Sequence, residues 1–184
     1  NRAVGWTRAR WVWVMGSGDL PDSQGLEHAL GTLRSSPNDR GHAWKVEALP
    51  PTEAGVPATF VPEWGTKLRW RNTMHHQGVI VPRNWLLEHP FDIQYKVLGD
   101  YAWMLDRWQS GHNVVCHPKE TLARVAATGL SRQFNKSLYL EEWRLKRTRL
   151  AGISMWAQPF WLWAKWAFKQ VSKARRSLGS STPQ

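Results

Sequence analysis

Cysteine is nearly absent from this sequence, acidic residues are scarce in its last third, and long apolar runs are missing. The single Cys116 excludes an internal disulfide and a cysteine-based metal site, and we expect a reducing compartment. The apolar runs all fall short of the ~20 residues that a helix needs to span a bilayer. The remaining composition, 42% hydrophobic and 21% charged over 184 residues, predicts one globular domain with a sizeable core.

Positive charge is concentrated toward the C-terminus. Residues 1–131 hold 14 Lys and Arg against 12 Asp and Glu, whereas residues 132–184 hold 11 against two, Glu141 and Glu142. A basic end on a nearly neutral body indicates contact with an anionic surface at that end only. A membrane, a nucleic acid or a diphosphate-bearing lipid would each provide such a surface.

Strand-like and helix-like segments alternate along the chain. Short β-prone runs predict strands at 11–15, 42–49, 78–81, 113–116 and 121–127. Apolar spacing and capping residues predict helices at 22–35, 84–88, 100–109 and 137–150, and four prolines make 50–66 a long loop. This alternation predicts an α/β fold with a mixed sheet flanked by helices, in a domain over 1–152 followed by a distinct segment over 153–184.

Three segments occur in an order that matches a known family. The first is Asn1-Arg2-Ala3-Val4 followed by the strand and turn Trp11 to Asp19; the second is Thr73-Met74-His75-His76-Gln77 with the apolar run Gly78 to Val81; the third is Phe91-Asp92-Ile93-Gln94-Tyr95-Lys96-Val97-Leu98-Gly99-Asp100-Tyr101. Together they resemble glycosyltransferase family 2 enzymes of the GT-A fold, with Ala127-Thr128-Gly129-Leu130-Ser131 at the place of a later turn in that family. The resemblance covers roughly residues 1–150 and implies the C-terminal, acceptor-side part of such an enzyme. We therefore expect the N-terminal nucleotide-binding half to be missing from this chain.

The resemblance also implies a reaction. It is the inverting transfer of a sugar from a nucleotide-diphosphate donor to a hydroxyl of a polysaccharide or of a lipid-linked acceptor. The acceptor hydroxyl must lose its proton to a positioned base, and the resemblance assigns that role to Asp100. The diphosphate leaving group needs positive charge, so a divalent cation, Mg²⁺ or Mn²⁺, is expected as cofactor.

Further site residues follow from the same resemblance. Asp19 and Ser17 are placed on the donor side, near the diphosphate or metal, although Gly16 and Gly18 stand where the commonest pattern has more acids. Substrate binding is assigned to four more residues: His76, Gln77, Gly129 and Ser131. Read without the family, Asp19 and Asp100 are equally typical of turn or helix-capping residues, and for Asp100 the two roles are compatible.

The C-terminal segment interleaves aromatic and basic residues. From about Pro159 they fit one helix with aromatic residues dense at its start and cations at its end, a composition typical of an interfacial helix on anionic lipid. The residues expected to contact the membrane are Trp161, Trp163, Trp166, Lys165 and Lys169. The alternatives are a helix packed on the core and a single-strand nucleic-acid site.

Two functions of different classes thus remain. The first is a sugar-nucleotide-dependent transferase that is cytoplasmic and peripheral on the inner face of the cell membrane, a location implied by the family. The second is a non-catalytic basic binding module, either a degenerate transferase or a nucleic-acid-binding domain. Because the body is nearly neutral, we favour the transferase and do not expect nucleic acid as its partner.

Overall fold

The computed structural model describes residues 1–49, 57–126 and 136–179, with the backbone alone for residues 153, 154 and 169–179. A mixed sheet forms the centre, in the order β1 (Trp11–Trp13), β5 (Val79–Pro82), β3 (Arg40–Ala48), β6 (Asn113–Val125) and β2 (Leu20–Pro21). The short β4 (Thr59–Phe60) also pairs with β3. Strands β3 and β6 run parallel, and each of the other pairings is antiparallel.

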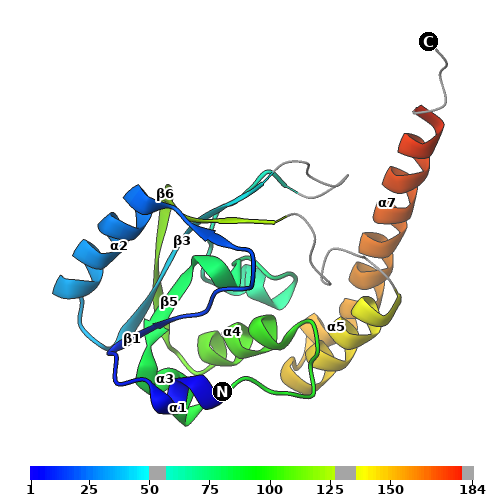
Figure 1. Cartoon of the computed structure of the whole chain (residues 1–184). Coiled ribbons are helices and arrows are strands. Elements are labelled where there is room, and N and C mark those ends of the chain that lie inside the picture. Colours follow the sequence, from blue (N-terminus) through cyan, green and yellow to red (C-terminus); the bar gives the residue numbers. More distant parts are fainter. Residues whose placement is uncertain (50–56, 127–135, 180–184) are drawn as a thin grey trace.

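Helices cover both faces of this sheet (Figure 1). The helix α2 (Ser23–Ser35) packs on one face, where Ala29 and Leu33 meet Trp44 and Ile80. Its N-cap is Asp22, whose side chain accepts a hydrogen bond from the Gly25 backbone, as the capping pattern predicted.

The opposite face carries α1 (Arg2–Trp6), α3 (Arg83–Glu88) and α4 (Gly99–Gln109). Strand alternation explains the two cores, because Val79 and Val81 of β5 enter the cluster under these helices while Ile80 between them faces α2. The predicted α/β fold with a mixed sheet flanked by helices is therefore confirmed.

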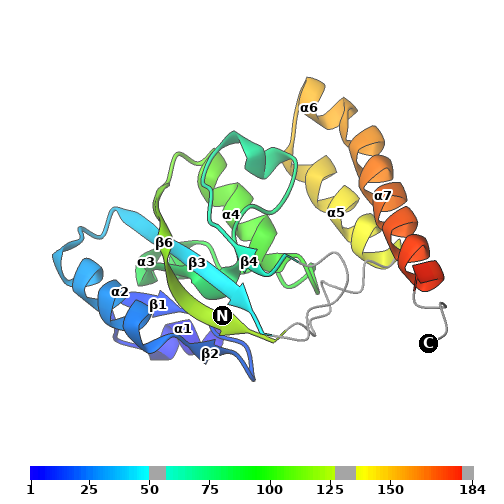
Figure 2. The ribbon, with the colours of Figure 1, turned by 90° about the horizontal axis from the view of Figure 1, so that it is seen from above.

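Two further helices extend the molecule beyond α4. The helix α5 (Lys136–Arg149) packs on α4, and Leu145 and Leu150 meet Tyr101 and Leu105 there. After the short α6 (Ile153–Trp156), α7 (Gln158–Gly179) runs back alongside α5 (Figure 2). None of the helices within the described ranges combines the length and apolar character needed to cross a bilayer.

Local patterning missed three features of the fold. The two strands predicted at 113–116 and 121–127 form the single strand β6, whose pairing with β3 jumps from Trp44–His117 to Lys45–Thr121. The interruption at 118–120 that suggested two strands is thus an irregularity inside one strand. Residues 2–6 form a helix that the sequence analysis did not predict, and β4 lies inside the predicted loop 50–66.

Candidate functional site

The turn after β1 holds Asp19 in a fixed position. Its Oδ2 atom accepts hydrogen bonds from the Gly16 backbone N–H at 2.8 Å and from Gln77 Nε2 at 2.6 Å. A Cβ atom on Gly16 would lie 2.5 Å from the same oxygen, so a side chain there would displace the carboxylate. The glycine that departs from the acid-rich family pattern is therefore the residue that this turn requires. Ser17 lies exposed in the same turn.

Asp100 lies in the first turn of α4, where a negative charge interacts favourably with the helix dipole. The N-cap position belongs to Leu98, so Asp100 does not cap the helix. Its Oδ1 atom accepts the Tyr101 backbone N–H at 2.7 Å, and Oδ2 lies 3.2 Å from His76 Nδ1. The Asp100 and His76 side chains are 22% and 36% exposed, so a ligand can reach both.

A single short turn joins the two carboxylates. His76 and Gln77 are neighbours in η2 (His76–Gly78), with His76 directed to Asp100 and Gln77 to Asp19. The indole of Trp13 fixes this turn by donating a hydrogen bond to the Gln77 carbonyl at 2.8 Å. Four residues that the sequence singled out thus form two side-chain pairs, Asp19–Gln77 and His76–Asp100, which the backbone of η2 joins, and we refer to these four residues as the candidate site.

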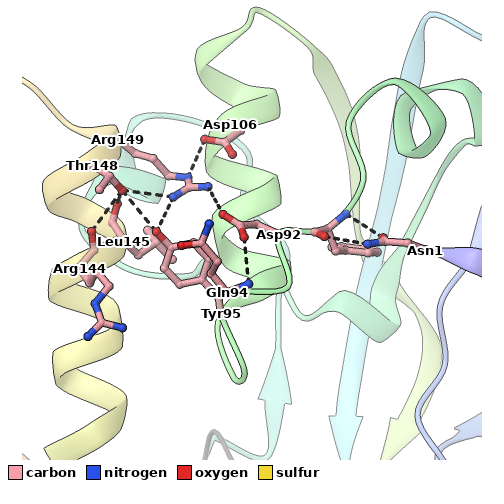
Figure 3. Close-up of polar contacts among 10 residues, drawn as sticks. Asn1, Asp92, Gln94, Tyr95, Asp106, Arg144, Leu145, Thr148 and Arg149 are labelled. Carbon is pink, nitrogen blue, oxygen red and sulfur yellow. Dashed lines mark hydrogen bonds and ion pairs between the residues drawn. The ribbon is translucent and has the colours of Figure 1, made fainter.

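The loop 91–98, which leads into Asp100, is held by residues that sequence reasoning did not identify (Figure 3). Arg149 of α5 donates to Asp106 Oδ1 at 2.8 Å and to the Tyr95 hydroxyl at 2.7 Å, and lies 3.5 Å from Asp92 Oδ2. Asn1 exchanges two hydrogen bonds with the Phe91 backbone, at 2.8 and 2.9 Å.

The end of the same loop is also fixed. Glu141 of α5 accepts the backbone N–H groups of Val97 and Leu98 at 2.9 and 2.8 Å. These partners lie more than 40 positions away in sequence, and no local pattern connects them. The Phe91-to-Tyr101 segment was the one signal that could have led to them.

Tyr101 anchors the helix directly after Asp100. Its hydroxyl donates to the Leu68 carbonyl at 2.6 Å, and the ring is 1% exposed. Burial, with Glu142 nearby, raises the pKa of Tyr101 well above its usual value. On the other side of the site, His76 borders a small cavity of about 20 Å³ whose remaining lining is apolar, including Val14, Phe91 and Trp103. The Asp100 carboxylate therefore lies between the fixed first turn of α4 and His76, and His76 itself borders the apolar cavity.

In the candidate site, the side chain that can bind a cation is the carboxylate of Asp19. Asp19 Oδ1 accepts no hydrogen bond from any residue that the structure describes, and this atom can bind a metal ion. Within residues 1–49, 57–126 and 136–179, no cluster of three or more His, Cys, Asp or Glu side chains is placed to hold a metal. Mg²⁺ is commonly bound by one or two carboxylates with substrate phosphates completing the shell, and Asp19 fits that use.

The remaining predicted site residues are placed as follows. Gly129 and Ser131 lie outside the described residues, as does the Lys169 side chain. Trp163 is 68% exposed, and Trp166 is partly buried. Trp161 donates to the Trp70 carbonyl at 2.8 Å, and Lys165 Nζ lies 2.8 Å from both carboxylate oxygens of Glu142.

Solved structures have a similar fold. The fold resembles S. aureus TarS 1–349 in complex with UDP-GlcNAc (TM-score 0.59, 13% identity, covering 88% of this chain and 49% of that one) and in complex with UDP (TM-score 0.55, 14% identity, 88% and 47%). TarS is a glycosyltransferase. The chain has a glycosyltransferase-like fold. It spans about half the length of the TarS chains that it matches.

The comparisons with solved structures show a likeness of fold and nothing more specific. The uncomplexed TarS 1–349 structure gives the same result, with a TM-score of 0.57 at 14% identity. No protein-family model matches the sequence, and no curated protein matches it. At such identities the likeness shows how the chain folds, whereas its chemistry has to be argued from the candidate site.

Proposed function

We propose that the chain is the acceptor-side part of an inverting glycosyltransferase, which transfers a sugar from a nucleotide-diphosphate donor to a hydroxyl of a polysaccharide or lipid-linked acceptor. The observation that carries the proposal is the two linked pairs Asp19–Gln77 and His76–Asp100, which lie in the turn after β1, in η2 and at the start of α4. The TarS chains with the same fold were crystallised with UDP and UDP-GlcNAc, which supports a nucleotide sugar as donor.

Asp100 is the general base in this proposal. Single displacement inverts the anomeric carbon: the acceptor oxygen forms its bond to that carbon as the bond to the diphosphate breaks, and the hydroxyl proton passes to Asp100 Oδ2. The nucleoside diphosphate then leaves. His76 positions the carboxylate through its 3.2 Å contact, and the Tyr101 backbone N–H holds the second oxygen. The clamped loop 91–98 keeps Asp100 in register with the acceptor.

Asp19 serves the donor side. Its Oδ2 atom is fixed by Gly16 and Gln77, which leaves Oδ1 directed to a ligand, and a bound Mg²⁺ or Mn²⁺ would supply positive charge to the diphosphate. Gln77 is 7% exposed, and its Oε1 atom has no hydrogen-bond partner among the described residues. We keep Gln77 as a contact to a sugar hydroxyl, which requires this buried oxygen to become accessible when the substrate binds. Ser17, Gly129 and Ser131 stay in the proposal as further contacts.

Membrane attachment completes the proposal. The helices α6 and α7 expose four large aromatic side chains, each more than two-thirds exposed: Trp156, Phe160, Trp163 and Phe168. Aromatic side chains beside cations are typical of helices that lie in a lipid headgroup layer. We place the enzyme in the cytoplasm, on the inner face of the cell membrane, where a lipid-linked acceptor would be presented to Asp100.

The test uses the natural polypeptide that contains this chain. It is mixed with UDP-, GDP- and TDP-sugars in turn, with Mg²⁺ or Mn²⁺ and a lipid extract as acceptor, and nucleotide release is followed. We expect release from one donor and a loss of roughly 10²- to 10⁴-fold in Asp100→Asn, because general-base catalysis contributes about that much. The substitution keeps an oxygen for the Tyr101 N–H, so the fold should persist.

The matched control is Asp39→Asn. Asp39 is an exposed acid that pairs with its neighbour Arg40, and its replacement should leave release unchanged. If the two variants lose release equally, Asp100 is not the base. If no donor releases nucleotide while lipid binding remains, the chain is a binding module rather than a transferase.

A further inference from the structure

A second, larger cavity lies outside the candidate site. It measures about 490 Å³ and is lined by Lys67, Trp70, Arg71 and Trp161, between the η1 segment (Thr66–Arg69) and the start of α7. This volume lies within the range of sites that bind small molecules. No residue of the candidate site contributes to its lining, so the two sites are distinct.

The aromatic walls of this cavity are held by hydrogen bonds to backbone carbonyls. The Trp70 carbonyl accepts from Trp161 Nε1 at 2.8 Å and from Lys146 Nζ at 2.6 Å, and the two indole rings meet edge to face at 6.0 Å. Gln158, which is fully buried, donates to the Arg69 carbonyl at 3.1 Å. The Trp161 side chain and the backbone of Trp70 are thus held in place without a ligand.

The two cations of the cavity are available to an anion. Lys67 pairs with Glu63 at 2.9 Å, but the two side chains are 60% and 45% exposed, and ion pairs of this kind are weak. Arg71 is exposed, and its side chain makes no hydrogen bond or ion pair with any residue in the described part of the chain. Lys67 and Arg71 can therefore both turn to a phosphate group, with Arg71 able to bind it through two N–H groups.

The surroundings of the cavity indicate where that phosphate comes from. Phe160 precedes Trp161 on α7 and is 78% exposed, and Trp163 and Phe168 continue the apolar exposure along the helix. Residues 153–184 contain no Asp or Glu. The cavity is thus cationic, and the surface of α7 next to it is apolar and lacks acidic residues. A cationic cavity suits the headgroup of an anionic lipid and an apolar surface suits its acyl region, whereas a fully polar ligand would match only the first.

We propose that this cavity binds the phosphate headgroup of an anionic membrane phospholipid while the exposed aromatic residues of α6 and α7 enter the lipid layer. The inference rests on the membrane attachment in the proposed function and assigns its recognition site. It also orients the enzyme. Leu68 in the η1 segment receives the Tyr101 hydroxyl, so the segment that carries Lys67 is braced by the residue next to Asp100.

The test measures binding of the whole chain to vesicles by sedimentation. One set of vesicles is phosphatidylcholine alone, and the other contains a minority of phosphatidylglycerol. We expect Lys67→Gln/Arg71→Gln to weaken binding to the phosphatidylglycerol vesicles by tenfold or more, roughly the contribution of two cations at an anionic surface, with binding to phosphatidylcholine unchanged. Both residues are exposed, so the fold is not at risk. Phe160→Gln/Trp163→Gln should weaken binding to both kinds of vesicle.

The charge-matched control is Arg34→Gln/Lys119→Gln. These exposed cations lie on α2 and β6, away from the cavity, and should affect binding by less than the Lys67 and Arg71 pair. Equal weakening by both double variants would overturn the site in favour of general charge attraction. Vesicle binding that the cavity variant leaves unchanged, together with binding of inorganic phosphate that this variant abolishes, would overturn the lipid as occupant. So would binding to single-stranded DNA that the cavity variant alone abolishes while vesicle binding persists. Nucleotide release is measured separately, so a failure of catalysis leaves the lipid result standing.

Discussion

Among individual residues, Gln77 is held on two sides: its side-chain amide contacts the Asp19 carboxylate, and its backbone contacts the Trp13 indole. Its Nε2 donates to Asp19 at 2.6 Å, and its backbone carbonyl receives the Trp13 indole. Gly78, next in the chain, has no room for a side chain, since a Cβ atom would lie 2.5 Å from the Trp44 carbonyl. The turn that carries His76 and Gln77 is therefore held by β1 and β3, independently of any substrate.

Replacing Gln77 by Glu should destabilise the chain in a pH-dependent way. At pH 7 the new carboxylate would face Asp19 in a nearly buried position, so we expect the free energy of unfolding to fall by about 2–4 kcal/mol. Toward pH 4 the introduced carboxyl becomes protonated and can donate to Asp19, so the loss should shrink. Urea unfolding at the two pH values measures the difference.

Gln77→Leu provides the comparison for that variant. It removes the hydrogen bond without adding a charge, so its cost should be about 1 kcal/mol and should not vary with pH. A Gln77→Glu chain as stable as the original at pH 7 would show that Gln77 and Asp19 are not in contact.

At the scale of elements, sequence patterning predicted what depends on neighbours in the chain. The positions of α2, α3, α4, α5 and α7 follow from apolar spacing with caps, and β1, β3 and β5 follow from short β-prone runs. The candidate site was predictable in the same sense, because Asp19, His76, Gln77 and Asp100 each belong to a family-like segment. Their direct contact depends on how β1, η2 and α4 pack, which local patterns do not encode.

Arg149 shows why the rest could not be read from the sequence. It is one of several cations in α5, and its neighbours Arg147 and Lys146 would have been equally plausible before folding. Its role arises because α5 packs on α4 and brings it to Asp92, Tyr95 and Asp106, all of them more than 40 positions away. The same helix holds a Glu142–Lys146 pair at the i, i+4 spacing, and burial of both side chains depends on the packing of α5 and not on that spacing.

Replacing Arg149 by Lys should loosen the loop that leads to Asp100. The single ammonium group of lysine cannot contact all three partners that the Arg149 guanidinium reaches. The free energy of unfolding should therefore fall by about 1–3 kcal/mol. Amide hydrogen exchange in residues 92–98 should become faster. Arg147→Lys, on an exposed position of the same helix, should change neither quantity. Unchanged exchange in the Arg149 variant would mean that Asn1 and Glu141 hold the loop without it.

In the whole molecule, one buried charge cluster joins three elements. Glu142 of α5 lies 2.8 Å from both Lys146 Nζ and Lys165 Nζ of α7, and Lys146 also donates to the Trp70 carbonyl after η1. With Gln158 and Leu162 also buried, α7 is bound to the body by its first half, so deleting it from Ile153 onward would uncover α5. Point substitutions of exposed aromatic residues are therefore the sounder way to test the membrane surface.

The cluster should leave a signature in the pH dependence of stability. Burial lowers the pKa of Lys146 from its ordinary value of 10.5 to about 8, although Glu142 opposes that shift. Between these values the unfolded chain binds more protons than the folded chain, so the free energy of unfolding should rise with pH. From pH 7.5 to 9.5 the contribution of Lys146 to stability should rise by about 2 kcal/mol, given ~1.4 kcal/mol for each pKa unit. Burial raises the pKa of the Cys116 thiol, which acts in the opposite direction in this range, so the contribution is taken as the difference between the original chain and a chain without Lys146.

Lys146→Met should lose this contribution, because methionine does not titrate. Urea unfolding of the two chains at pH 7.5 and 9.5 measures it, and the upper limit stays below pH 10, where deprotonation of Tyr101 in the unfolded chain would begin to lower stability. Lys136→Met, at an exposed position of α5, should keep the rise in full. If the original chain and Lys146→Met instead change in parallel with pH, the Lys146 ammonium is solvated, and α7 is held to the body by its apolar and amide contacts rather than by the Glu142 cluster.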